Sequence, residues 1–228
     1  MTSVRNMASD HAALTPGFID VLQTAVPGTS RFLRPDQQVI AEGDGLQAVV
    51  AVASGLLRCV RMTADGRRHV GRLARAGDVI GLGVHRVHRF SVEAITPCSV
   101  VAFSAKAIDH AYAERADVRK AIMAAIRTDL AARNRNQFRV GRLPADERVA
   151  DLVLEILDDP EASDGVRYGF RMPPEDMADY LGLTVEIVGR ALGRLQRDGM
   201  LTMADSQHFS AVCRSALKAF VKGDEGTG

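Results

Sequence analysis

The side chains best suited to chemistry lie in one polar stripe near the C-terminal end of the sequence. If residues 185–198 form an α-helix, positions i, i+3, i+4, i+7, i+8 and i+11 counted from residue 186 share one face. Arginine can donate two hydrogen bonds to guanine O6 and N7, and glutamate can accept one from cytosine N4. The stripe therefore predicts contact with base edges, and the alternative is an ordinary solvated face. Its members are Glu186, Gly189, Arg190, Gly193, Arg194 and Arg197.

Position along the stripe divides the predicted roles. The early residues of a recognition helix meet base edges in the major groove, so we predict base reading by Glu186, Gly189 and Arg190. Side chains farther along, and the residue just before such a helix, are placed for the sugar–phosphate backbone. The residues predicted to contact phosphate are Thr184, Arg194 and Arg197.

Two glycines in the stripe need a separate explanation. Each glycine in a helix interior costs about 1 kcal/mol relative to alanine, and a helix that needed only solubility would carry Lys or Glu there. A close approach of the helix backbone to DNA would explain Gly189 and Gly193. The alternative is that both glycines arose by neutral drift, at positions where the residue type does not matter.

The segments around the stripe predict a helix-turn-helix. Pro174–Tyr180 has proline near its start and acidic residues in its first turn, as helix N-termini favour. Gly182 can end that helix in the left-handed conformation, and Thr184 can cap the next one. Downstream we predict a small hairpin, the wing, from the short runs at residues 200–203 and 209–212, and then a closing helix over residues 214–221.

The N-terminal half has a sequence pattern typical of an antiparallel β-domain. Residues 14–22 predict a short helix, and short apolar runs fill residues 31–104. Turn pairs built on Gly43, Gly55, Gly66 and Gly77 separate the runs at intervals of 12, 11 and 11 residues. Strands at this spacing predict a sandwich or roll.

A long helix follows, with an apolar stripe that must be buried. It spans roughly residues 117–138, about 30 Å at 1.5 Å per residue. Packing against a symmetry-related copy is the simplest way to bury the stripe, and packing on the chain's own β-domain is the alternative. Residues 115–148 also hold nine basic against four acidic side chains, which can steer a polyanion or simply form a solvated face. The predicted dimer residues are Val118, Ile122, Ala125, Ile126 and Leu130.

Composition narrows the class of protein. The 228 residues carry a net charge of +1, and no apolar run reaches the roughly 18 residues of a membrane span. The first ten residues lack a secretory signal, so we expect no membrane association and a cytoplasmic location. Cys59, Cys98 and Cys213 form no Cys-x-x-Cys pair and no disulfide framework. With no nucleophile–base signature and no metal triad, we expect no enzyme activity, no metal and no cofactor.

Taken together, these motifs resemble the CRP/FNR superfamily of transcription regulators over about residues 14–220. The resemblance lies in the glycine framework, in the run 146–150, and in the run 178–186 followed by Arg190, which is close to the FNR and FixK form. The run 88–94 looks FixK-like. The resemblance implies an α+β fold: an N-terminal cyclic-nucleotide-binding-like β-roll sensor (14–115), a long dimerisation helix (116–140) and a C-terminal winged helix-turn-helix (141–222). It further implies a homodimer on a palindromic double-stranded operator, activation through RNA polymerase, and circuits for microaerobic or nitrogen-related genes.

Three departures from the family bear on the signal that is sensed and on the specificity for DNA. No cysteine precedes Cys59, which argues against an FNR-type iron–sulfur cluster. Where relatives bind a cyclic nucleotide phosphate, only a vestigial pocket is predicted, and Glu93 beside it would repel phosphate. Gly189 stands where FNR-type helices have Ser, Thr or Cys. Two alternatives stay open: a regulator gated by an unidentified ligand in the β-roll, and a cyclic-nucleotide module without DNA contact. The residues of the vestigial pocket are Gly77, Asp78, Arg89 and Ser91.

Overall fold

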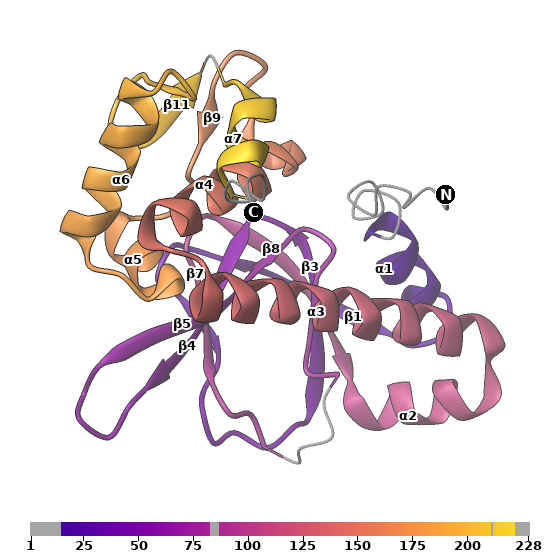
Figure 1. Ribbon diagram of the computed structural model, residues 1–228. Helices are drawn as coiled ribbons and strands as arrows, with labels where there is room; N and C mark the ends of the chain where they lie inside the picture. The colour runs from indigo at the N-terminus through magenta and orange to yellow at the C-terminus, as the bar shows by residue number, and fades with distance from the viewer. Residues whose placement is uncertain (1–14, 83–86, 211, 222–228) are drawn as a thin grey trace. The chain divides into compact units, whose positions relative to one another are not determined.

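The computed structural model describes residues 15–82, 87–210 and 212–221, and it separates into two compact units (Figure 1). The first unit comprises Met1–Arg67 and Gly71–Arg133, and the second comprises Arg68–Val70 and Asn134–Gly228. Within the described ranges, no helix is both long enough and apolar enough to cross a membrane.

Two four-stranded sheets form the β-domain of the first unit. Their strand orders are β1-β8-β3-β6 and β2-β7-β4-β5. Pairing is antiparallel between β8 and both β1 and β3, and between β7 and both β2 and β4. The predicted antiparallel β-roll is therefore confirmed. The strands are β1 (Gly28–Leu33), β2 (Gln38–Ile40), β3 (Ala48–Ser54), β4 (Leu56–Met62), β5 (Arg68–Arg75), β6 (Val79–Ile80), β7 (Ser91–Ala94) and β8 (Cys98–Ser104).

The four evenly spaced glycines all occupy turns with positive φ. Gly55, between β3 and β4, has φ +92°, and a Cβ there would stand 2.5 Å from both the Sγ of Cys98 and the carbonyl oxygen of Pro97. Only glycine fits this turn without displacing backbone. Gly43, Gly66 and Gly77 have φ of +90°, +81° and +95°. The four glycine turns predicted from the sequence therefore separate consecutive strands, from β2 to β6.

Helices cover one sheet of the β-domain. α1 (Thr15–Gln23), α2 (Ala105–Glu114) and the first part of α3 (Ala116–Arg142) contribute to one apolar core with β3 and β8. Phe103 of β8 and Val118 of α3 are fully buried in it, and Ile122 is 5% exposed. A second core, with Leu57 and Val92, joins strands of both sheets.

This packing divides the apolar stripe of α3. Val118 and Ile122 pack inside their own unit, which is the alternative that the sequence left open for the stripe. Ala125 packs partly against the same core. Ile126 and Leu130, by contrast, are 37% and 56% exposed in the single chain. The part of the stripe available to a second copy therefore begins later in the helix than the sequence pattern indicated.

The second unit is a helical bundle with a small sheet. In the three-stranded sheet, of order β10-β11-β9, the predicted wing hairpin gains a third strand, β9, for which the sequence made no prediction. Phe209 of β11 stacks on Tyr168 of β9 with ring centroids 5.6 Å apart, which fixes the extra strand. The elements are α4 (Ala145–Leu157), η2 (Pro160–Ala162), β9 (Tyr168–Gly169), α5 (Pro174–Leu181), α6 (Val185–Arg197), β10 (Thr202–Met203), β11 (His208–Ser210) and α7 (Arg214–Val221).

A buried arginine ties the end of α3 into this bundle. The Arg139 side chain is fully buried, with its Nε 2.6 Å from Asp151 and its Nη2 2.5 Å from Glu155, both on α4. Its guanidinium also lies 5.4 Å from the ring centroid of Tyr180. Burial opposes the charge, but Glu155, Tyr180 and Asp151 outweigh it and raise the pKa of Arg139. Arg139 therefore does not belong to the basic surface that the charge count had suggested.

Candidate nucleic-acid interface

The turn between α5 and α6 is fixed by two backbone devices. α5 ends at Gly182, which is left-handed at φ +64° and ψ +43°, and the carbonyl of Ala178 accepts hydrogen bonds from the N–H groups of Gly182 and Leu183. At the start of α6 the Thr184 hydroxyl accepts a hydrogen bond from the N–H of Ile187 at 3.4 Å. The predicted helix-turn-helix, with its glycine end and threonine cap, is confirmed.

One face of α6 is anchored in the core of the unit. Val188, Ala191 and Leu195 are 2%, 0% and 0% exposed. They recur at three- and four-residue steps, so they form a single buried row, and α6 packs against both α4 and α5. This anchoring fixes the rotation of α6 and presents the opposite face to solvent.

The opposite face carries the whole predicted stripe. All six of its residues, from Glu186 to Arg197, are exposed. At Gly189 and Gly193, apart from the adjoining backbone of α6 itself, no atom of the described residues lies within 4 Å of the position that a Cβ would take. Packing within the described residues therefore does not require glycine at either position. Another molecule can approach the backbone of α6 closely at both positions.

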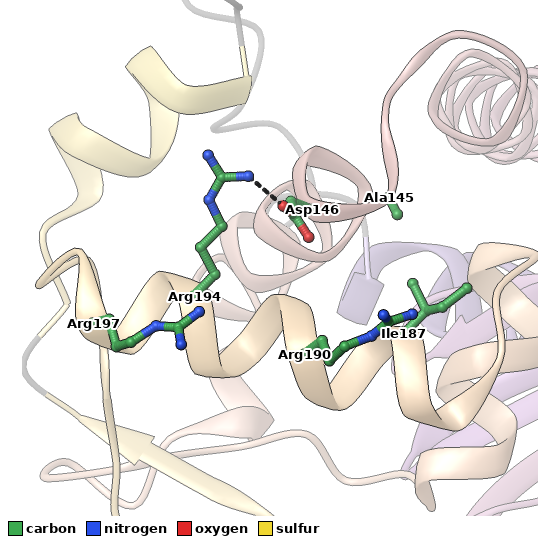
Figure 2. A pocket seen from close by; sticks show the side chains of 6 residues that line it. All are labelled: Ala145, Asp146, Ile187, Arg190, Arg194 and Arg197. Carbon is green, nitrogen blue, oxygen red and sulfur yellow. Dashed lines mark hydrogen bonds and ion pairs between the residues drawn. The ribbon is translucent and has the colours of Figure 1, made fainter.

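Three arginines of α6 line an open hollow beside the start of α4 (Figure 2). Figure 2 shows Arg190 and Arg197 extending along α6, whereas Arg194 reaches away from it toward α4. Three guanidinium groups in one hollow have the charge that could attract a polyanion such as a nucleic acid backbone. The lining residues are Ala145, Asp146, Ile187, Arg190, Arg194 and Arg197.

Arg194 differs from its two neighbours because it is already paired. Its Nη1 lies 2.6 Å from Oδ2 of Asp146, and its Nε lies 3.7 Å from Oδ2 of Asp198. Its guanidinium carbon also stands 5.6 Å from the ring centroid of Phe220 in α7. Arg190 and Arg197 form no ion pair within the described ranges. Spacing along the helix places Arg194 with Arg197, and no local pattern indicates its partner Asp146.

Glu186 is held in its charged form. A hydrogen bond from the Thr184 hydroxyl lowers the pKa of the Glu186 carboxyl, its own backbone N–H adds to this, and nearby Arg190 contributes a smaller effect. An ionised carboxylate is purely a hydrogen-bond acceptor, as pairing with a cytosine amino group requires. Thr184 therefore caps α6 and also favours the ionised form of Glu186.

The turn before α6 is also braced from α4. The Nε of Arg148 donates to the carbonyl of Leu143 at 2.8 Å, and its Nη1 donates to the carbonyl of Leu181 at 3.1 Å. One side chain thus ties the start of α4 to the end of α5. The sequence analysis saw Arg148 only as part of a family motif, because nothing local indicates which carbonyls it meets.

The residues of the predicted vestigial pocket serve separate turns. Asp78, next to Gly77, accepts a hydrogen bond from the N–H of Arg75 at 2.9 Å. The Ser91 hydroxyl accepts one from the N–H of Glu42 at 3.1 Å. Arg89 is exposed, and no contact within the described ranges joins it or Ser91 to the first pair.

Glu93 has a partner on its own sheet. Its carboxylate lies 2.9 Å from Arg58 across the β4–β7 pairing. Both side chains are partly exposed, whereas their neighbours along the strands, Cys59 and Val92, are buried in the core. Because side chains alternate along a strand, Arg58 and Glu93 lie on the sheet face away from that core.

The three cysteines have different environments. Cys59 and Cys98 are buried, and Cys213 is exposed at the start of α7. Burial raises the pKa of the Cys59 thiol to about 11, which keeps it protonated. A hydrogen bond with Ser215, aided by the N–H of Ala216, lowers the pKa of Cys213.

Two family models match this chain, one in each half. Residues 170–201 match "Bacterial regulatory proteins, crp family", which covers α5, the turn and α6. Residues 30–115 match "Cyclic nucleotide-binding domain", which covers the β-domain and α2. The match to the crp family thus falls on the helix-turn-helix described above.

Relatives align with this chain across both halves. The nitrogen fixation regulation protein FixK of Bradyrhizobium diazoefficiens is 32% identical over 176 residues, covering 73% of this chain and 71% of that protein. FixK of Azorhizobium caulinodans is 26% identical over 217 residues, covering 94% and 86%. The solved structure of FixK2 from Bradyrhizobium japonicum superposes with a TM-score of 0.77 at 30% identity, covering 84% of this chain and 96% of that one.

Proposed function

Since the chain belongs to the FixK group of CRP/FNR transcription regulators, we propose that it acts as a homodimer that places two copies of α6 in successive major grooves of a palindromic operator. Such half-sites lie about 34 Å apart, one helical turn of DNA. The observation that carries the proposal is the exposed stripe on α6, which faces solvent because the opposite face is anchored in the core.

Each side chain of the stripe has a proposed role. Arg190 reads guanine through a bidentate contact, and Glu186, held ionised, accepts from cytosine. Gly189 lets the backbone approach the bases between them. Arg197, Arg194 and Thr184 contact phosphates and fix the register of the helix on the duplex.

The partner subunit is proposed to pack along α3. Ile126 and Leu130 leave apolar surface uncovered in the single chain, and they are four residues apart on one side of the helix. A second copy of α3 would cover both. We accordingly assign residues 14–115 to the sensor, 116–140 to the dimer helix and 141–222 to DNA binding.

The cellular role is proposed from the relatives. The curated relatives include proteins described as nitrogen fixation regulators, and the FnrL relative of Cereibacter sphaeroides is described as a transcriptional activator. We propose a cytoplasmic activator that contacts RNA polymerase and controls microaerobic or nitrogen-related genes.

A second candidate is a regulator of the same fold gated by a small ligand in the β-roll. The match of residues 30–115 to a cyclic nucleotide-binding domain favours it. The carboxylate of Asp78 argues against a phosphate at the vestigial pocket, because it would repel a second anion and already accepts a hydrogen bond from the N–H of Arg75. A footprint by the purified protein without added ligand supports the first candidate, and a footprint that appears only with cell extract supports the second.

Substitution of Arg190 tests the proposed base contact. Arg190→Ala should weaken operator binding by about 1–3 kcal/mol and remove the base preference at one position of each half-site. Arg197→Ala is the matched control, since loss of a phosphate contact weakens binding to all sequences equally and lowers the salt slope by about one. Unchanged base preference in Arg190→Ala, measured against a panel of single-base operator variants, would rule out the contact.

A further inference from the structure

One ion pair lies within the proposed DNA-binding surface itself. Asp146, in the first turn of α4, and Arg194, on the outer face of α6, meet at 2.6 Å across the hollow of Figure 2. Arg194 also has Asp198 at 3.7 Å. One guanidinium therefore faces two carboxylates, so the positive charge of Arg194 is neutralised within the described part of the protein, unlike those of Arg190 and Arg197.

The ion pair between Asp146 and Arg194 can break so that Arg194 binds another anion. Its side chains are 53% and 29% exposed, and ion pairs accessible to water contribute little to folding. The Asp146 carboxylate is not needed to begin α4 either, because Glu147 supplies another negative charge in the same helical turn. The fold can therefore lose the Asp146–Arg194 ion pair at small cost. Because the pair lies where a DNA phosphate is expected, we infer that it acts in DNA binding.

We propose that Asp146 is an internal competitor of the DNA phosphate for Arg194, and that it sets the sequence-independent part of the DNA affinity. In the free protein Asp146 holds the guanidinium of Arg194. On DNA a phosphate oxygen takes the place of that carboxylate, and Asp146 is left facing the polyanion. This inference rests on the proposed function, because it assigns Arg194 to phosphate.

Such a competitor acts equally on all sequences. Base reading depends on Arg190 and Glu186, which do not contact Asp146 within the described ranges, so the preference among operators should not involve Asp146. The affinity for any duplex should fall instead, and with it the time spent on nonspecific DNA. Asp146 is therefore a residue that limits affinity and not one that reads sequence.

The test is a binding titration with Asp146→Asn. Fluorescence anisotropy would compare wild type and variant on an operator duplex obtained by selection from a random library, and on a scrambled duplex of the same length. We expect the variant to bind both duplexes about two- to fivefold more tightly, the factor that corresponds to losing one exposed ion pair. The salt slope should steepen by up to about one.

Two control variants separate competition from simple repulsion. Glu147→Gln removes the same charge from the same turn of α4 without touching the Arg194 contact, and it should change affinity less than Asp146→Asn does. In an Arg194→Ala background, Asp146→Asn should no longer tighten binding beyond the effect of Glu147→Gln. Asp146→Ser repeats the test with a different polar residue in case the amide disturbs α4.

The outcomes also separate this inference from the proposed function. Weaker or unchanged binding by both Asp146 variants, with wild type still bound to its operator, would overturn the competitor role and make the ion pair a structural tie between α4 and α6. An equal gain from Glu147→Gln, or a gain that survives in the Arg194→Ala background, would overturn it as well. Failure of the wild type to bind any duplex would instead contradict the proposed function.

Discussion

Replacement of Gly189 by alanine should change stability and DNA binding in opposite directions. The residue lies in the interior of α6 and is exposed, and no atom is within 4 Å of the position that its Cβ would take. The new methyl group therefore meets no neighbour, and alanine loses less backbone freedom on folding than glycine does. We expect Gly189→Ala to raise the free energy of unfolding by about 0.4–1 kcal/mol.

The same methyl group would stand between α6 and the bases. If the backbone at Gly189 approaches the floor of the major groove more closely than that of FNR-type helices, which carry a Cβ at this position, the added methyl group pushes the helix outward and strains the contacts of Glu186 and Arg190. We expect a loss of operator affinity of about 1 kcal/mol or more, close to a tenfold rise in Kd. Stability would be measured by urea denaturation, and affinity by anisotropy on the selected operator.

Gly141→Ala is the matched control for this prediction. Gly141 also lies in a helix, near the end of α3, with no atom within 4 Å of the position of an added Cβ, but it lies outside the α6 stripe. It should gain stability without losing operator affinity. Undiminished affinity in Gly189→Ala together with the stability gain would refute the close approach and leave drift as the explanation. Absence of the stability gain would contradict the open, helical environment of Gly189.

Three further predictions follow from buried and exposed side chains. Arg139→Ala should destabilise the protein by about 3 kcal/mol, because it removes the buried guanidinium that pairs with two partly buried carboxylates, Asp151 and Glu155; a loss below 1 kcal/mol in urea denaturation would contradict this. Leu130→Glu should convert the dimer to monomer in sedimentation velocity while keeping the circular dichroism spectrum, because this side chain is 56% exposed in the single chain; a persistent dimer would place the interface elsewhere. Of the thiols, Cys213 should react first with Ellman's reagent, since its pKa is lowered and it is exposed, whereas buried Cys59 should react only on unfolding; fast labelling of a Cys213→Ser variant would show the reverse.

Local chemistry explains what could be predicted from the sequence. The left-handed end at Gly182, the cap at Thr184 and the four positive-φ turns of the β-domain all depend on the residue at the position itself. A tight turn admits few residue types, so its position can be recognised without knowing what packs around it. The buried and exposed faces of α6 follow from a regular apolar period in the same way.

Features set by distant partners could not be predicted. The apolar stripe of α3 gave no sign that Val118 packs on its own β-domain while Leu130 stays exposed, since both are simply apolar at helical spacing. Arg139 counted as one more surface charge until its acidic partners, 12 and 16 residues onward, were known. The third wing strand, β9, is two residues long and is held by pairing with β11. Asp146 and Arg194 lie 48 residues apart, beyond any local pattern.

The central claim, that two copies of α6 read successive major grooves, is tested most directly by a methylation-interference experiment on the selected operator with purified protein. Methylation of guanine N7 in the major groove blocks a bidentate arginine contact. We expect two symmetric clusters of interfering guanines about one helical turn apart, lost together in Arg190→Ala. A single cluster, or interference that does not depend on Arg190, would contradict it.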